Sequence, residues 1–166
     1  DVAAPRSGTA PGEHAAAPPL ALHVLLLEDS VDDAELILNE LRLGGYEPVA
    51  RRVASREEML EALEDGSWQI VFLDHGIPGG ALGSLEALAG FDVDLPAILI
   101  ARVIEEEEAA QALRAGARDF VSKGNLSRLV PAVAWALDDV QTRRQRREGD
   151  EALRQSERRL RVALDA

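Results

Sequence analysis

The sequence predicts an α/β fold in which a parallel sheet carries helices on both faces. Three observations support this prediction. Five short apolar segments alternate along the chain with five segments of helical periodicity. The strongest apolar runs show no polar alternation, which is typical of strands buried on both faces of a parallel sheet. Two of these runs end directly in acidic residues.

The first half of the chain contains two strand–helix pairs after an irregular start. Residues 1–21 are rich in alanine and proline, without periodicity, and we expect a disordered arm there. The first strand is expected at 23–27 and its helix at 31–43, which Gly44 and Gly45 end. A second strand is expected at 47–54.

The second helix has a clear start. Ser55 is a good N-cap for residues 56–65, and Glu58 three residues later completes a capping box. Gly66 ends that helix.

The second half repeats the alternation three times. We expect the remaining strands at 69–74, 97–101 and 119–123. We expect the remaining helices at 82–90, at 105–115 and from Leu126 into 140–166. The run from Glu105 to Glu108 suits the first turn of a helix because the helix dipole favours acids there.

Composition excludes several kinds of site. The chain has no cysteine, so disulfides and cysteine metal sites are excluded, and the cytoplasm is the expected location. Acidic residues number 30 against 18 basic ones, and most arginines lie near the C-terminus, so we expect no direct nucleic-acid binding by the core. No apolar run approaches the ~18 residues of a membrane span.

Charged residues cluster where the predicted strands end. Glu28, Asp29, Asp74 and Lys123 all fall at the carboxyl ends of strands, where reactive groups gather in such sheets. Carboxylates this close repel one another unless a cation joins them, and hard oxygen ligands suit Mg²⁺. Asp74 could then act as a nucleophile on phosphorus. Lys123 is the only lysine in the chain, which suggests a need for a compact charge at that point.

Four segments, in this order, resemble the receiver family of two-component signalling: LLLEDSVDD, IVFLDHGIPGG, LPAILIA and AGARDFVSKGNL. The resemblance covers residues 22–140 and implies a flavodoxin-like, doubly wound sheet with strand order 2-1-3-4-5. It also implies a phosphoacceptor module rather than an enzyme, which receives its phosphoryl group on Asp74 from a histidine kinase or a phosphotransfer protein.

The resemblance assigns roles at the site as well. It implies that Asp29 binds Mg²⁺ directly beside Glu28 and Asp74, and that the Gly76 backbone carbonyl completes the protein's metal ligands. Lys123 would contact the phosphoryl group. Phe120 lies where the family places a switch aromatic, although plain core packing explains it equally well.

The site departs from the family pattern at the fourth strand. Ala101 stands where receivers usually carry serine or threonine, whose hydroxyl binds the phosphate. We therefore expect phosphorylation of Asp74 to be only weakly coupled to the face made by the fourth and fifth helices. Arg102 could compensate, although one position further along a strand normally points away. Gly124 replaces the proline usually found after the lysine. These departures favour an alternative, a pseudo-receiver that binds partners without phosphorylation.

Two enzyme classes fit less well. Haloacid-dehalogenase-type hydrolases carry a second aspartate two residues after the nucleophile, where this chain has Gly76. A dinucleotide-binding oxidoreductase would need a glycine fingerprint after the first strand, which is absent. His75 beside Asp74 is interpreted as a solvent-facing loop residue.

Residues 141–166 form a charged helical linker in this interpretation. Leu153 and Leu160 lie seven residues apart, which suits a short coiled coil and predicts a homodimer through the last helix. The stretch EALRQSERRLRVALDA also resembles the helix that leads into PAS sensory domains. We expect the natural protein to continue there into an output domain.

Overall fold

The computed structural model describes residues 17–92 and 94–166. Its sheet has five parallel strands in the order β2-β1-β3-β4-β5, the flavodoxin-like order that was expected. The strands are β1 (Leu20–Leu27), β2 (Tyr46–Val53), β3 (Ile70–Asp74), β4 (Ala97–Ala101) and β5 (Asp119–Ser122). The helices are α1 (Val31–Leu43), α2 (Arg56–Asp65), α3 (Gly80–Phe91), α4 (Glu106–Arg114) and α5 (Leu129–Leu164), with a 3₁₀ turn at Leu126–Arg128 before α5.

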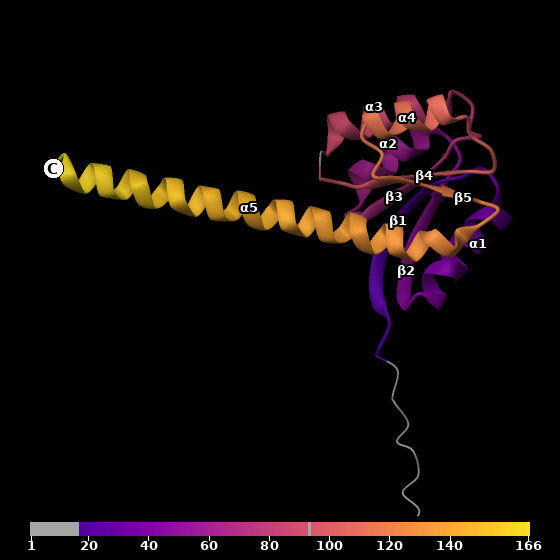
Figure 1. Ribbon diagram of the computed structural model, residues 1–166, viewed down its shortest axis with the longest axis horizontal. Helices are drawn as coiled ribbons and strands as arrows, with labels where there is room; N and C mark the ends of the chain where they lie inside the picture. The colour runs from indigo at the N-terminus through magenta and orange to yellow at the C-terminus, as the bar shows by residue number, and fades with distance from the viewer. Residues whose placement is uncertain (1–16, 93) are drawn as a thin grey trace, which may run out of the picture.

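The helices cover both faces of the sheet. Helices α1 and α5 lie on one face, and α2, α3 and α4 lie on the other (Figure 1). The pleat of each strand divides the core accordingly. Leu25, Val71 and Leu99 pack on the side of α2 and α3, whereas the alternate residues pack toward α1 and α5. Both faces are therefore apolar, which is why the central strands show no polar alternation.

The first strand begins earlier than expected. β1 starts at Leu20 rather than at residue 23, so its first two residues belong to the segment assigned to the arm. It pairs with β2 from Leu20 opposite Tyr46 onward, and the Leu20 N–H donates to the Gly45 carbonyl at 2.9 Å. Residues 20 and 21 are exposed, which hid the strand pattern. Residues 1–16 of the expected arm lie outside the described residues.

The predicted capping box at α2 is confirmed with one change. The Ser55 hydroxyl accepts from the Glu58 N–H at 3.2 Å, as expected. The returning bond to the Glu58 carboxylate comes from the Ala54 N–H at 2.9 Å, one residue before the cap. The start of α1 is similar, because the Ser30 hydroxyl accepts from the Asp33 N–H at 3.2 Å. Ser30 thus fixes where α1 begins, directly after the end of β1.

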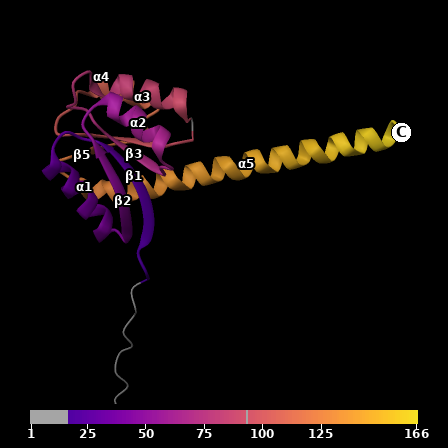
Figure 2. The same cartoon turned by 180° about the vertical axis from the view of Figure 1, so that it is seen from behind.

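Helix α5 is 36 residues long and has two parts. Its first part packs on the sheet and buries Leu129, Val133 and Val140. Its second part projects far beyond the rest of the chain (Figures 1 and 2). Near the point of departure, Asp94 forms ion pairs with Arg143, at 3.9 Å, and with Arg147. No helix in the described residues is long and apolar enough to cross a membrane.

Candidate functional site

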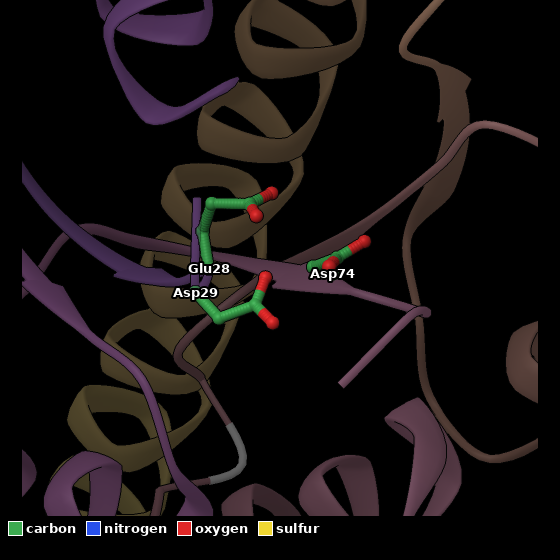
Figure 3. Close-up of side chains that lie close together, drawn as sticks. All are labelled: Glu28, Asp29 and Asp74. Atoms are coloured by element: carbon green, nitrogen blue, oxygen red, sulfur yellow. The ribbon is translucent and has the colours of Figure 1, made fainter. Parts of the chain in front are cut away.

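Three carboxylates meet at the carboxyl edge of the sheet. Glu28 and Asp29 follow β1, and Asp74 is the last residue of β3, the neighbouring strand. One oxygen atom from each lies within 4.8 Å of the others. Figure 3 shows the Glu28 and Asp29 side chains at the end of β1, beside Asp74. The predicted acidic cluster is therefore present, and parallel strand pairing brings it together.

Lys123 supplies the cation of this cluster. It follows β5, and its Nζ lies 2.7 Å from Glu28 Oε2, 2.9 Å from Asp33 Oδ2 and 3.1 Å from Asp74 Oδ1. The lysine side chain is only 9 % exposed. Its backbone N–H donates to the Ala101 carbonyl at 2.8 Å, so the β4–β5 pairing fixes where the side chain starts.

Asp33 is a site residue that the sequence did not reveal. It lies in the first turn of α1, and its carboxylate contacts both Lys123 and Arg102. Hydrogen bonding to Lys123 is the main reason that its pKa is lowered. Asp32 and Asp33 are adjacent acids at a helix start, and the sequence alone gave no reason to prefer one of them. The difference arises only when the Ser30 cap sets the helix phase.

Burial and close charges shift the pKa values of the site residues. Burial raises the pKa of Glu28, and the nearby Lys123 ammonium only partly opposes this shift. Burial alone would lower the pKa of Lys123, but its contacts with Glu28, Asp33 and Asp74 outweigh burial and raise the pKa above its ordinary value. One lysine thus balances several carboxylates, so a further cation at this edge would lower the electrostatic energy.

The cluster opens into a cleft of about 390 Å³. The lining residues are Asp29, Asp33, Asp74, His75, Gly76, Ala101, Arg102, Val103 and Lys123. Gly76 lies tightly against the carboxylate: its N–H donates to Asp74 Oδ1 at 3.2 Å, and an added Cβ would lie 3.2 Å from Asp74 Oδ2. A small residue at this position keeps the cleft beside Asp74 open.

The interpretation of His75 as a solvent-facing loop residue is confirmed only in part, because His75 lies in the turn after β3 and lines the cleft but also contacts α4. Its side chain is 26 % exposed, and Nε2 lies 3.3 Å from Glu108 Oε2 on α4. The run of glutamates does begin that helix, as expected, and the Glu105 N–H donates to Glu108 Oε2 at 3.3 Å. Glu108 can reach His75 because α4 starts close to the cleft. His75, the residue directly after Asp74, therefore connects the end of β3 to α4.

Arg102 lies on the cleft, and the strand alternation that would have turned it away does not apply to it. β4 ends at Ala101, so Arg102 lies in a bend where strand alternation no longer holds. Its Nη2 lies 2.9 Å from Asp33 Oδ1 and 3.1 Å from Asp33 Oδ2. Arg102 therefore lines the same cleft as Asp74.

The two predicted switch positions differ in their surroundings. Ala101 is 2 % exposed and lines the cleft with a methyl group in place of a hydroxyl. Phe120 is half-buried and packs against the core on the side of α2 and α3. Phe120 is not among the lining residues of the cleft. Core packing thus accounts for its position, and a switching role stays a prediction.

The donor atoms of the acidic cluster fit Mg²⁺. Carboxylate oxygens are the hard ligands that this ion prefers, and Mg²⁺ is usually held by one or two carboxylates while it keeps several waters. The cleft beside Asp29 and Asp74 leaves room for such waters. The excess of carboxylates over cations supports the same ion.

Comparison with known families gives the class. The chain belongs to the response regulator receiver domain family, whose model matches residues 24–134. Receiver domains are signalling modules of two-component systems rather than enzymes in the usual sense, and they bind Mg²⁺ through acidic residues. The comparison with curated proteins gave no match.

Solved structures share the fold. NtrX from Brucella abortus, in complex with ADP, is 28 % identical with a TM-score of 0.69, and the alignment covers 78 % of this chain and 29 % of NtrX. A CheY-like receiver domain protein from Methanospirillum hungatei is 20 % identical with a TM-score of 0.65, covering 74 % of this chain and 98 % of that one. A fusion that carries the trimeric coiled coil of yeast Spc42 is 22 % identical with a TM-score of 0.69, and the alignment covers 89 % of this chain and 97 % of the fusion. This chain thus corresponds to less than a third of NtrX.

Proposed function

We propose that this chain receives a phosphoryl group on Asp74 in a Mg²⁺-dependent reaction, from a histidine kinase or a phosphotransfer protein. The observation that carries the proposal is the contact between Lys123 Nζ and Asp74 Oδ1, 3.1 Å, in a cleft that also contains the Glu28–Asp29 acidic pair. Asp74 is 6 % exposed and lines this cleft, through which a phosphodonor would reach its carboxylate.

The chemistry is a transfer without oxidation or reduction. A carboxylate oxygen of Asp74 forms the new bond to phosphorus while the bond from phosphorus to the donor atom breaks. The electron pair of the broken bond leaves with the donor. Lys123 stands beside the nucleophile, where its ammonium offsets charge on the phosphoryl oxygens.

Glu28, Asp29 and Asp74, together with the Gly76 backbone carbonyl, are the residues that we propose hold Mg²⁺. The ion would offset the negative charge of the carboxylates and of the phosphoryl oxygens. Before the ion binds, Lys123 contacts both Glu28 and Asp74 and so holds their two strand ends together.

We further propose how the module acts. Residues 22–140 are the receiver, and the charged helix of residues 141–166 transmits its state to an attached or partner output domain, with a PAS domain as the expected continuation. Leu153 and Leu160 are 60 % and 61 % exposed on α5 and form the stripe through which two copies would pair. The cytoplasm, where histidine kinases present their phosphoryl groups, is the proposed location.

A pseudo-receiver that works without phosphate is the second candidate. Ala101 favours it, because the cleft has no hydroxyl at this position for a phosphoryl oxygen. The intact acidic pair, Asp74 and Lys123 favour the phosphoacceptor.

Intact mass spectrometry separates the two candidates. The chain is incubated with acetyl phosphate, with and without Mg²⁺, beside an Asp74→Asn variant. The phosphoacceptor gains the mass of one phosphoryl group only when Mg²⁺ and Asp74 are both present. An unchanged mass with several small phosphodonors, and with a matched kinase, would instead support the pseudo-receiver.

A further inference from the structure

Ala101 leaves one side of the cleft without a side-chain hydroxyl for a phosphoryl group. A phosphoryl group carries up to two negative charges and three acceptor oxygens. Lys123 is already shared among three carboxylates, so it cannot satisfy these oxygens alone. Ala101 offers only a methyl group. Mg²⁺ would share in offsetting the charge, but three acceptor oxygens leave a place for another donor at the edge of the cleft beside Ala101.

Arg102 is the next residue along the chain and lines this cleft. A continuous line of charged groups connects it to the nucleophile. Its guanidinium contacts Asp33, Asp33 contacts Lys123, and Lys123 contacts Asp74. The Arg102 guanidinium is thus connected by three ionic contacts to the Asp74 carboxylate, which would carry the phosphoryl group.

Among the described residues, the guanidinium is held by hydrogen bonds on one side only. Both contacts with Asp33 use the same nitrogen, Nη2, although a guanidinium has five N–H donors. The Arg102 side chain is 72 % exposed, so it can turn toward the cleft without disturbing packed neighbours. Asp33 keeps it close to the position where a new anion would appear.

We propose that Arg102 contacts the phosphoryl group on Asp74 and replaces the hydroxyl that Ala101 lacks. This inference rests on the proposed function. Arginine can donate two parallel hydrogen bonds to a phosphoryl group, and the dianion competes with the single charge of Asp33 for the guanidinium. Because Arg102 lies between β4 and α4, the new contact draws this connection toward the cleft.

Beryllofluoride, which mimics a phosphoryl group, is the probe for this contact. Its affinity for the whole chain is measured by titration in Mg²⁺, and the bound species is followed by ¹⁹F NMR. Arg102→Gln should weaken binding about tenfold or more, as expected for the loss of a charge-assisted hydrogen bond, and should shift the bound ¹⁹F signals. Arg114→Gln, which removes an equal charge from an exposed position on α4, should leave both unchanged.

A double variant tests the replacement itself. Ala101→Thr should restore most of the affinity in the Arg102→Gln background and add little to the natural chain, because the two donors serve the same anion. Equal beryllofluoride affinity and unchanged ¹⁹F signals in Arg102→Gln would overturn the inference while the proposed function stood. A natural chain that binds no beryllofluoride and takes no phosphate from acetyl phosphate would overturn both.

Discussion

Lys123→Met removes the one ammonium that lies among three carboxylates, and it keeps most of the length of the side chain. Glu28 and Asp74 are 2 % and 6 % exposed, so solvent screens their unpaired charges poorly. Removing one partner of a buried ion pair costs about 3–5 kcal/mol because the other charge stays buried and unpaired. We therefore expect the free energy of unfolding, at pH 7 in EDTA, to fall by about 3 kcal/mol or more.

Urea unfolding followed by circular dichroism measures this loss, with Lys123→Arg as the control that keeps the charge. The loss should shrink at pH 5. Without the ammonium, the already raised pKa of Glu28 rises further, so its carboxylate takes up a proton and the repulsion falls. A loss at pH 7 below about 1 kcal/mol, the size expected for an exposed ion pair, would refute the reasoning.

Three further predictions concern the lysine, the glycine beside Asp74 and the long helix. The carboxylates raise the pKa of Lys123, so the stability that its ammonium adds to the fold should be complete below pH 10.5 and be lost as pH rises through the higher folded-state pKa. ¹³Cε NMR of this single lysine should still show mainly ammonium at pH 10.5. A titration midpoint at or below pH 10.5 would contradict this prediction. Gly76→Val should slow phosphorylation by acetyl phosphate about tenfold or more, because the added side chain crowds Asp74. Gly90→Ala, which has open space around its added Cβ, should not slow it. Equal phosphorylation rates in Gly76→Val and the natural chain would count against the tight fit. Light scattering should show a dimer that weakens on truncation after about residue 140. A monomer at high micromolar concentration would count against pairing through α5.

The sheet could be predicted from the sequence because its signals are local. Unbroken apolar runs mark the buried strands, and the Ser55–Glu58 box marks a helix start to the residue. The acidic cluster could be predicted because parallel strands end at one edge, so Glu28 and Asp74 had to meet there.

Contacts between distant helix starts and loops could not be predicted in this way. Asp33 reaches Lys123 across 90 positions of the chain, and only the phase of α1 decides that it does so rather than Asp32. The orientation of Arg102 stayed open in the sequence because strand alternation would turn it away, whereas β4 ends one residue earlier, at Ala101.

The expectation of weak coupling between Asp74 phosphorylation and the face made by α4 and α5 depends on Arg102. It assumed that Arg102 would at most partly replace the missing hydroxyl of Ala101. Arg102 lies on the cleft, which favours a fuller replacement, and the strength of the coupling stays a prediction. Hydrogen exchange across residues 102–120, with and without beryllofluoride, measures it.

The most direct test of the central claim is to locate the phosphoryl group. The chain is treated with acetyl phosphate and Mg²⁺ and then reduced with borohydride, which converts an aspartyl phosphate into a stable alcohol. Peptide mass spectrometry should find this alcohol at Asp74 alone, and omission of Mg²⁺ should abolish it. Reduction at Asp29 or Asp33, or at no aspartate, would contradict the account.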